Sequence, residues 1–286
     1  MKGNYNLRPM TEKDIPAGMR LKNAAGWNQL EGDWKLFLDS SLDGSMVAEY
    51  EGKVIGTVTT VNYSGRFSWI GMVLVDPEIR RMGIGTSLLK EAITRAKDKG
   101  IIRLDATPKG KLLYDALGFE DEYGLRRYEI KAYPSNLIDH SKPACSKISD
   151  HDLSNIIEYD QHIFGAPRAG ILRSLYNIGP AYAWICGSGD NIQGYCFGRP
   201  GSNFEQIGPI IALNEEIAFS LLCNAIPQCK GRPIIIDIPD DQKAFVQSVQ
   251  EIGFTIQRPF IRMYLGKHPY PGRPEQQFAI TGPEIG

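Results

Sequence analysis

The residues most able to do chemistry in this sequence form a loop around two glycines, Gly83 and Gly85, which follows an apolar run ending at Val75. Glycines lack a Cβ atom, so backbone N–H groups beside them can approach a ligand closely. The helix expected to start here adds unpaired amides and a partial positive charge at its N-terminus. Arg80 and Arg81 stand directly before the glycines. This arrangement favours a cradle for a pyrophosphate.

The loop also has a plainer explanation, because Gly-x-Gly between a strand and a helix is often only a tight connection. Two better-known phosphate loops are excluded. The pattern Gly-x-x-x-x-Gly-Lys-Ser/Thr is absent, and a dinucleotide-binding fingerprint would need a glycine at Leu88. The arginine pair before the glycines favours an anion as the ligand.

The loop and a second motif resemble the GNAT superfamily of N-acetyltransferases. The acetyl-CoA signature of that family, Arg/Gln-x-x-Gly-x-Gly/Ala, is matched by Arg80-x-x-Gly83-x-Gly85, and its Tyr-x-x-x-Gly-Phe feature is matched by the segment from Tyr114 to Phe119. The resemblance implies acetyl-CoA as cosubstrate, with its pantetheine arm pairing with the preceding strand like an added strand. The residues expected to bind it are Val73, Leu74, Val75, Arg80, Arg81, Met82, Gly83, Ile84, Gly85 and Thr86.

Two residues are candidates for proton transfer. The resemblance suggests that Tyr114 gives a proton to the leaving CoA sulfur, although a tyrosine on an amphipathic helix is more often a packing residue. No carboxylate stands in residues 67–73, where some family members carry a general base, so Asp105 is the nearest candidate. Burial would raise the pKa of Asp105, which suits a base. A structural role is equally open, because Asp237 occupies the equivalent place in the second half; deprotonation through water is a third route.

The residues for the second substrate are less clearly marked. Trp27 and Asn28 lie between the first two expected helices, in a region that closes over the acceptor in the resembled fold. Arg199 stands in a Gly/Pro-rich segment of the second half, and binding groups are often mounted on such loops. Packing of the tryptophan and ordinary surface exposure of the arginine are the alternatives.

The elements that must position these residues occur twice along the chain. Each half contains a helix opening, a hairpin, a β-rich run around a glycine, an amphipathic helix, a buried strand and a helix ending in Gly-Phe, and equivalent landmarks are 132–138 residues apart. The hydroxyls of Thr11 and Ser149 are the expected caps of the two helix openings. In the first half, residues 46–50 are expected to form a strand of the hairpin and residues 101–106 the buried strand. We therefore predict an α/β fold, an α+β mixed sheet built of two tandem GNAT-like (acyl-CoA N-acyltransferase) domains, residues 1–134 and 135–286. We expect final strands 126–130 and 260–265 to close each half, and the proline-rich tail after 267 to extend over the surface.

The second half has lost the chemistry-bearing loop. Between Gly208 and the next helix it is four residues shorter than the first half, and the Arg/Gly motif is missing. Glu215 and Glu216 begin that helix, where they satisfy its dipole and would repel a pyrophosphate. Val249 takes the place of Tyr114. We predict that the second domain is unable to bind CoA in the usual way.

Composition and charge exclude several classes of partner and binding site. The 286 residues contain 32 Lys and Arg against 33 Asp and Glu, so no global positive field exists to hold nucleic acid or an anionic membrane. There is no apolar run of the length that spans a bilayer, and the first residues lack the apolar core of a signal peptide. No Cys-x-x-Cys pair is present, so we expect no metal site and five reduced thiols: Cys145, Cys186, Cys196, Cys223 and Cys229.

These observations together predict a cytoplasmic enzyme that moves an acetyl group from acetyl-CoA to a primary amine of a small molecule, by direct attack in a ternary complex. All five cysteines lie outside the first half, which disfavours an acyl-cysteine intermediate. The alternatives are another acyl group, a protein lysine or N-terminus as acceptor, and a CoA-binding sensor without turnover. No nucleic acid, membrane or metal is expected as a partner, and a homodimer is left open.

Overall fold

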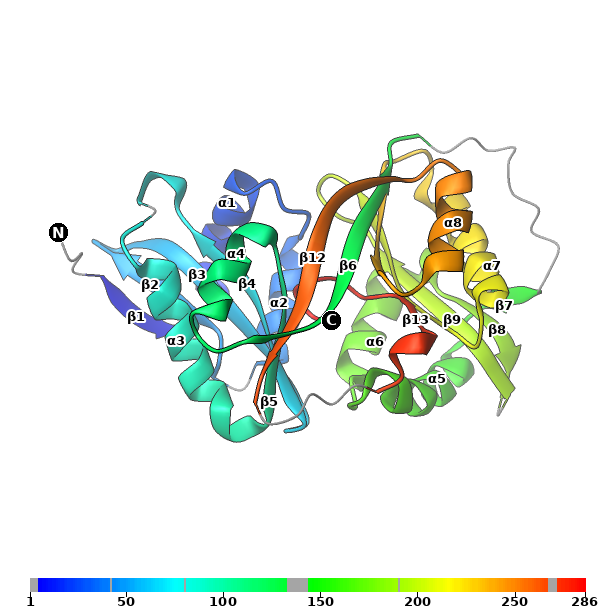
Figure 1. Cartoon of the computed structure of the whole chain (residues 1–286), viewed down its shortest axis with the longest axis horizontal. Helices are drawn as coiled ribbons and strands as arrows, with labels where there is room; N and C mark the ends of the chain where they lie inside the picture. The colour runs from blue at the N-terminus through cyan, green and yellow to red at the C-terminus, as the bar shows by residue number, and fades with distance from the viewer. Residues whose placement is uncertain (1–4, 42, 80, 133–143, 190, 267–271) are drawn as a thin grey trace.

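One continuous mixed sheet runs through both halves of the chain (Figure 1). The computed structural model describes residues 5–41, 43–79, 81–132, 144–189, 191–266 and 272–286. Within these residues the sheet has 13 strands in the order β1-β2-β3-β4-β5-β12-β6-β11-β10-β9-β8-β7, and β13 pairs with β10 off this path. The predicted α/β class with a mixed sheet is confirmed.

The first half follows the predicted order of elements. A 13-residue amphipathic helix directly follows the glycine loop. The elements are β1 (Asn6–Pro9), α1 (Ile15–Ala24), α2 (Glu31–Asp39), β2 (Met46–Tyr50), β3 (Lys53–Tyr63), β4 (Phe67–Val75), α3 (Ile84–Ala96), β5 (Ile101–Ala106), α4 (Pro108–Asp115) and β6 (Glu120–Ile130).

The second half repeats this order. Ser149 begins its first helix as predicted, because its hydroxyl accepts from the backbone N–H of Asp152 at 3.3 Å and so satisfies one unpaired amide. The elements are β7 (Cys145–Lys147), α5 (Asp150–Phe164), α6 (Ala169–Ile178), β8 (Trp184–Ser188), β9 (Asn191–Arg199), β10 (Glu205–Ala212), α7 (Glu215–Ala225), β11 (Ile234–Pro239), α8 (Lys243–Glu251), β12 (Thr255–Leu265) and β13 (Gln277–Ala279).

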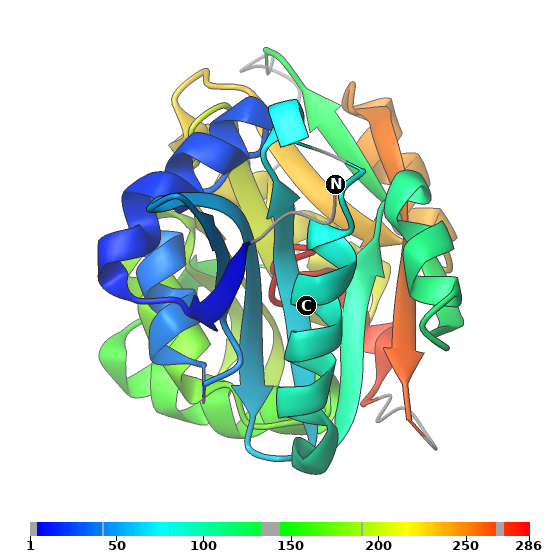
Figure 2. The ribbon, with the colours of Figure 1, turned by 90° about the vertical axis from the view of Figure 1, so that its left-hand side faces the viewer.

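The helices cover the sheet on both faces. Helices α1, α2, α5 and α6 pack on one face and form a single apolar cluster with strands of both halves, whereas α3 with α4, and α7 with α8, cover the other face (Figures 1 and 2). Because the first cluster is shared, the two halves are joined through buried apolar surface as well as through the sheet. No described helix is long and apolar enough to cross a membrane.

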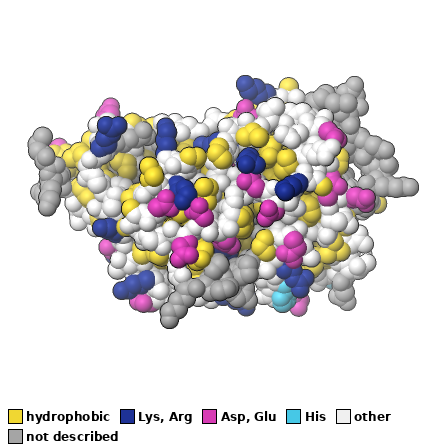
Figure 3. Space-filling view, viewed as in Figure 1, with side chains coloured by type: hydrophobic (Ala, Val, Ile, Leu, Met, Phe, Trp, Pro, Cys, Tyr) yellow, Lys and Arg dark blue, Asp and Glu magenta, His cyan; other side chains and the backbone are white. Residues whose placement is uncertain are grey.

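The surface carries both signs of charge. On the face shown in Figure 3, Lys and Arg side chains are interspersed with Asp and Glu side chains, and hydrophobic groups lie scattered between them. This agrees with the near-zero net charge of the sequence.

The two halves exchange their closing strands, which the sequence analysis did not foresee. Strand β12 of the second half lies between β5 and β6 of the first, and β6 in turn pairs with β11 of the second half. Figure 1 shows β12 and β6 side by side in the middle of the molecule. The expectation that strands 126–130 and 260–265 close their own halves was wrong, because each strand completes the sheet of the other half.

A buried ion pair fastens each exchanged strand. Arg262 of β12 donates Nε and one terminal nitrogen to the two carboxylate oxygens of Asp105 on β5, at 2.8 and 2.9 Å. Arg127 of β6 makes the same bidentate contact with Asp237 of β11, at 2.7 Å for both bonds. The four side chains are almost fully buried. Two equivalent aspartates therefore hold two equivalent arginines across the junction.

The C-terminal tail is interior, and this corrects another expectation. Residues 267–271 lie outside the described part of the chain, but from Gln277 onward every residue except Pro283 is buried. The tail first adds β13 to the second half and then passes between the halves, where Ile285 joins the large shared core. The prolines before it predicted an extended chain, but proline content carries no information on the apolar surface that receives the residues after them.

The cysteines also depart from the prediction. Cys145 and Cys186 are direct partners in the β7–β8 ladder and form a disulfide, whereas Cys196, Cys223 and Cys229 are free and buried. The expectation of five reduced thiols was wrong for this pair. Strand register brings together two cysteines that are 41 residues apart, and no local spacing reveals such a register.

The ion pairs at the exchange predict a symmetric loss of stability. Asp105→Asn and Asp237→Asn each leave a buried arginine without its counter-charge, so each should lower the free energy of unfolding by about 3–5 kcal/mol. Denaturant unfolding measures this. The control is Asp240→Asn, whose partnership with Arg126 is half exposed and should contribute about 0–1 kcal/mol. A loss no larger than that of the control would contradict the proposed fastening.

Candidate active site

An open slot separates the ends of β4 and β5. The two parallel strands pair only at their beginnings, where Phe67, Ser68 and Trp69 of β4 face residues 101–103 of β5. Beyond Trp69, β4 continues to Val75 and β5 continues to Ala106 without pairing between them in the described chain. The main chain of β4 therefore presents donors and acceptors along an edge that another extended chain can use.

A β-bulge marks the point where this slot begins. Thr57 of β3 lies opposite Leu74, but Thr59 lies opposite Gly71, so the register shifts between the two pairs. Met72, within the bulge, has a φ of 48°. A bulge bends its strand and re-aims the side chains that follow it. The bulge lies just beyond Trp69, the last residue of β4 that pairs with β5.

The predicted pantetheine-binding residues lie on the strand that borders this slot. After the bulge, the side chains of Val73 and Val75 pack toward α3, and that of Leu74 packs into the shared core on the opposite face. Strand β3 pairs with Leu74 and Val75 along the other edge of β4. The geometry fits an added strand between β4 and β5, and the assignment of these residues to CoA stays a prediction.

The glycine loop leads into α3 without a side-chain cap. Gly83 is the N-cap of α3 with a φ of 79°, in the left-handed region that glycine adopts readily, and within the described chain no side chain accepts from the first amides of this helix. Arg81, Met82 and Gly83 are exposed. The first-turn amides, including those of Gly85 and Thr86, are therefore available to a ligand. Arg80 lies outside the described residues.

Asp76 anchors the loop at the end of β4, a role that the sequence analysis missed. Its carboxylate lies 2.8 Å from Arg20 and 3.3 Å from Lys53, and it also accepts from the backbone N–H of Glu78. Burial acts to raise the pKa of Asp76, but the hydrogen bonds from Arg20, Glu78 and Lys53 outweigh it and lower the pKa. The loop thus carries a carboxylate whose charge is already balanced by two cations.

Tyr114 lies near the end of α4, the helix that follows β5 directly. Its ring meets Phe119 edge to face, with 5.8 Å between the ring centroids. Gly110 leaves room for it, since a Cβ there would lie 3.0 Å from the tyrosine ring. Burial raises the pKa of Tyr114 to about 12, so the hydroxyl keeps its proton throughout the neutral range. A proton donor is chemically consistent with this state, and the role itself stays a prediction.

Asp105 is engaged by the exchanged strand. Both of its carboxylate oxygens accept from Arg262, as described above. Burial raises the pKa of Asp105, and the charge and hydrogen bonds of Arg262 act in the opposite direction. The general-base hypothesis is untested, but this geometry favours the structural alternative, and the matching pair of Asp237 with Arg127 does so too.

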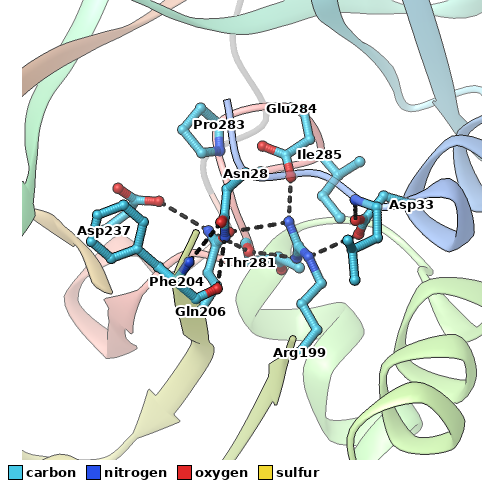
Figure 4. A network of polar contacts seen from close by, with 12 residues as sticks. Asn28, Asp33, Arg199, Phe204, Gln206, Asp237, Thr281, Pro283, Glu284 and Ile285 are labelled. Carbon is cyan, nitrogen blue, oxygen red and sulfur yellow. Dashed lines mark hydrogen bonds and ion pairs between the residues drawn. The ribbon is translucent and has the colours of Figure 1, made fainter. Parts of the chain in front are cut away.

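Trp27 and Asn28 contact the second half. The side-chain oxygen of Asn28 accepts from the backbone N–H groups of Asn203 and Phe204, both at 3.0 Å, and its side-chain nitrogen donates to the carbonyl of Phe204 at 3.1 Å. Trp27 is half-buried, and its carbonyl accepts from Ser202 at 3.3 Å. Asn28 thus pins the loop between β9 and β10 to the first half (Figure 4).

Arg199 ends β9 and points into the interior between the halves. It forms ion pairs with Asp33 of α2, at 2.9 Å, and with Glu284 of the tail, and it donates to the carbonyl of Thr281 at 2.9 Å (Figure 4). Burial raises the pKa of Asp33, and Arg199 opposes this shift. The guanidinium of Arg199 therefore links α2, β9 and the tail. This structural explanation differs from both the acceptor-binding role and the surface position that the sequence left open.

The tail lies directly on β4 at the bulge. Trp69 donates its indole N–H to the carbonyl of Pro283 at 3.0 Å, and a Cβ on Gly71 would lie 2.7 Å from the carbonyl oxygen of Glu284. Only glycine at position 71 permits this approach. On the face opposite α3, the beginning of the slot is therefore covered by main chain from the second half.

The second half has an equivalent slot, and its own tail fills it. Strands β10 and β11 pair only at residues 205–206 and 234–235. In the opening beyond, β13 pairs antiparallel with β10, with Ile210 opposite Ala279 and Ile211 opposite Gln277. On the other side, the N–H of Ile280 donates to the carbonyl of Asp237 on β11 at 3.0 Å. A strand of the chain itself thus occupies the space between β10 and β11.

The helix after this second slot is also closed to ligands. The side chain of Asn214 caps α7 by accepting from the N–H of Ile217 at 3.0 Å, and Glu215 and Glu216 form its first turn. The same position in the first half is an uncapped glycine. A filled slot and a capped helix support the prediction that the second domain does not bind CoA, and the filling strand is a cause that the sequence analysis missed.

Two family models match the chain in succession. A model described as "Acetyltransferase (GNAT) family" matches residues 16–119, and one described as "Acetyltransferase (GNAT) domain" matches residues 156–279. The two matched segments correspond to the two halves of the repeat.

Similar proteins span nearly the whole chain. The chain is 26% identical over 264 residues to holothin acyltransferase of Pseudoalteromonas sp. (strain SANK 73390), covering 92% of this chain and 88% of that protein. It is 27% identical over 257 residues to the uncharacterized N-acetyltransferase YitH of Bacillus subtilis (strain 168), covering 87% of each. The crystal structure of a Pyrococcus horikoshii protein, provisionally described as an acetyltransferase, has the same fold, with a TM-score of 0.82 at 23% identity, covering 99% of this chain and 96% of that one.

The uncapped start of α3 predicts how CoA binding can be removed. Arg81→Glu with Gly83→Asp places two carboxylates beside the open amides, where they repel a pyrophosphate and compete for its donors. We expect the dissociation constant for CoA, measured by titration calorimetry, to rise about 100-fold or more. Arg81→Glu alone, at a position that is already non-glycine, should give part of the effect.

The control for this prediction is Asn214→Asp at the start of α7. It adds a carboxylate to the equivalent helix but keeps a capping acceptor, so CoA affinity should stay unchanged. A folded Arg81→Glu, Gly83→Asp variant with the CoA affinity of the parent protein would contradict the cradle.

Proposed function

Because the chain belongs to the GNAT acetyltransferase family, with two such domains in tandem, and is an acyltransferase, we propose that its first domain acetylates a primary amine of a small molecule with acetyl-CoA. The amine attacks the thioester directly within a ternary complex. The second domain completes the sheet of the first and contributes its tail to the site, but it carries no acetyl-CoA. The proposal includes the cytoplasmic location expected from the sequence, where CoA thioesters are available.

The observation that carries this proposal is the difference between the two slots. Between β10 and β11, β13 makes main-chain contacts at Ile210, which aligns with Val73 when Gly208 is aligned with Gly71. Between β4 and β5 no described strand does so. The filled slot is therefore a template for the empty one: pantetheine, which carries two amides, would take the place that β13 takes in the second half.

The pyrophosphate would then meet the start of α3. Open backbone amides and the helix dipole stabilise negative charge at this position, and Arg81 adds a guanidinium beside it. The residues proposed to bind acetyl-CoA are those expected from the sequence: Val73, Leu74, Val75, Arg80, Arg81, Met82, Gly83, Ile84, Gly85 and Thr86.

The chemistry would take place where the slot begins. A neutral amine attacks the thioester carbonyl, and its oxygen becomes an oxyanion that a main-chain N–H near the bulge of β4 can stabilise. Collapse of this intermediate breaks the carbon–sulfur bond, and Tyr114 gives its proton to the CoA thiolate. The amine loses its proton to water or to a base. The arginine-bound state of Asp105 makes it a weaker candidate for that base than the sequence alone implied.

The tail supports a small acceptor over a protein acceptor. Pro283 and Glu284 press main chain against Trp69 and Gly71 on the face opposite α3. An extended peptide crossing β4 on this face would have to displace them, together with Ile285, which is fully buried. The Pseudoalteromonas relative is named for holothin, not for a protein acceptor, which also favours a small acceptor.

The proposal predicts one CoA site per chain. Titration calorimetry should give a stoichiometry of one, because β13 and Asn214 close the second site, and thiol release from acetyl-CoA should depend on an added amine. Two equivalent sites would contradict the assignment of the second domain. CoA binding without amine-dependent thiol release across a broad panel would favour the sensor alternative.

The proposed acid role of Tyr114 predicts a specific kinetic change. Tyr114→Phe removes the proton donor, so kcat should fall about 100-fold while KM for acetyl-CoA changes little. Because burial raises the pKa of Tyr114 to about 12, loss of its proton should not lower kcat of the parent enzyme below about pH 11. The control is Tyr264→Phe, which changes a half-buried tyrosine whose hydroxyl donates to Glu120. An unchanged kcat in Tyr114→Phe would exclude the role.

A further inference from the structure

Arg258 of β12 is a partly buried arginine that forms no ion pair within the described chain. Its Nε is buried and has no hydrogen-bond acceptor, and within the described chain no carboxylate forms an ion pair with its guanidinium. Its nearest aromatic partner is Phe260, whose ring centroid lies 5.1 Å from the guanidinium carbon. Buried donors are rarely left without a partner in a folded protein, so this one calls for an explanation.

The neighbouring arginines, in contrast, each form an ion pair with a carboxylate. Arg262 is paired with Asp105, and Arg103 is paired with Glu122. Arg127, which lies directly opposite Arg258 in the β12–β6 ladder, is paired with Asp237. Burial lowers the pKa of Arg258 to about 10, and the charge of Arg127 acts in the same direction. Of these four arginines, Arg258 is therefore the one that forms no ion pair in the described chain.

The strand pattern places Arg258 on the same face of the sheet as the tail. Side chains alternate along a strand, so Arg258, Phe260 and Arg262 share one face of β12. The guanidinium of Arg262 lies 4.6 Å from the ring centroid of Trp69, which identifies this face as the one opposite α3. Phe260 packs with Ile280 of the tail on it.

Arg258 also lies at the open end of the slot. β12 pairs with β5 only as far as Ile261, which faces Ala106, the last residue of β5. Arg258 stands three residues farther along β12, beyond the end of β5. Glu284, whose main chain touches Gly71 at the bulge, is close enough to act on the charge of Arg258. Arg258 therefore lies on the tail's face of the sheet, beyond the end of β5, where β4 and β5 are no longer paired.

We propose that Arg258 binds a carboxylate of the acceptor, so that the substrates are amines that also carry a carboxylate. One guanidinium presents a two-donor fork that matches a carboxylate. A doubly charged phosphate fits less well, because Asp237 and Glu284 lie nearby. This inference rests on the proposed function, since it assigns specificity to the same site. It also makes the second domain, through its exchanged strand, a contributor to substrate recognition in the first.

The kinetic test uses matched acceptors that differ only in this charge. β-Alanine, 4-aminobutyrate and 4-aminobenzoate are each compared with their carboxamides. We expect kcat/KM to favour the carboxylate by about 10- to 100-fold in the parent enzyme. Arg258→Met should remove the preference and Arg258→Lys should retain part of it. Arg126→Met is the control: it removes an arginine from the opposite face of the neighbouring strand β6, and the preference should persist.

A binding test keeps the proposal falsifiable if none of these amines is turned over. Butyrate and benzoate, which lack an amine, are titrated into the CoA-saturated enzyme alongside butyramide and benzamide. Tighter binding of the carboxylates, lost in Arg258→Met, supports the proposal. Equal binding of acid and amide by the parent protein, or a preference that survives in Arg258→Met, overturns it.

Two further measurements distinguish this proposal from a purely structural role of Arg258 and from a failure of the proposed function. Thermal unfolding distinguishes a structural role: Arg258→Met removes a partly buried charge that forms no ion pair in the described chain, so its melting temperature should be equal to or above that of the parent protein, and a marked decrease would overturn a ligand-binding role. CoA affinity, measured separately, should be the same in every Arg258 variant. Failure of the parent protein to bind CoA would refute the proposed function, whereas CoA binding without a carboxylate preference would refute the Arg258 assignment alone.

Discussion

The architecture depends on two reciprocal ion pairs, Asp105 with Arg262 and Asp237 with Arg127. Each pair links a strand of one half to the closing strand of the other, inside a region from which water is excluded. A charge left alone there would be costly, so the exchanged arrangement is strongly preferred over any in which one strand is displaced. Because the exchange makes one sheet from two, the tail, the loop after β9 and the helices α1 and α2 all meet at the same junction.

Much of the fold follows from local sequence patterns. The strands 46–50 and 101–106 are found where alternation and apolar runs predicted them, and the cap at Ser149 begins a helix as expected. The order of elements could be predicted because the same pattern occurs in both halves of the chain. The strand exchange could not be predicted, since a closing strand has the same alternation whichever neighbour it pairs with. Partner choice is decided by contacts between residues more than a hundred positions apart, such as Arg127 with Asp237.

The candidate site divides in the same way. The glycine loop is a local motif, and its backbone requirements can be read from residue types alone: Gly83 adopts the left-handed conformation that such a turn needs. Asn28 and Arg199 were predicted to bind the acceptor because of their side-chain chemistry. Their polar atoms instead form contacts between the halves, which only the tertiary arrangement reveals. Asp76 and Arg258 were overlooked for the opposite reason. Nothing in the residues around them indicates that two cations converge on Asp76, or that Arg258 forms no ion pair within the described chain.

Strand β13 behaves toward the second domain as a permanently tethered ligand. A segment joined to the protein it occupies has an effective concentration far above that of any dissolved metabolite, so its site is filled at all times. The first domain, in contrast, would gain from its own ligand a stability that grows only with the logarithm of the free ligand concentration. In the duplicated fold, the occupancy and rigidity of the second domain would therefore be constant, whereas the rigidity of the first domain would vary with the free concentration of its ligand.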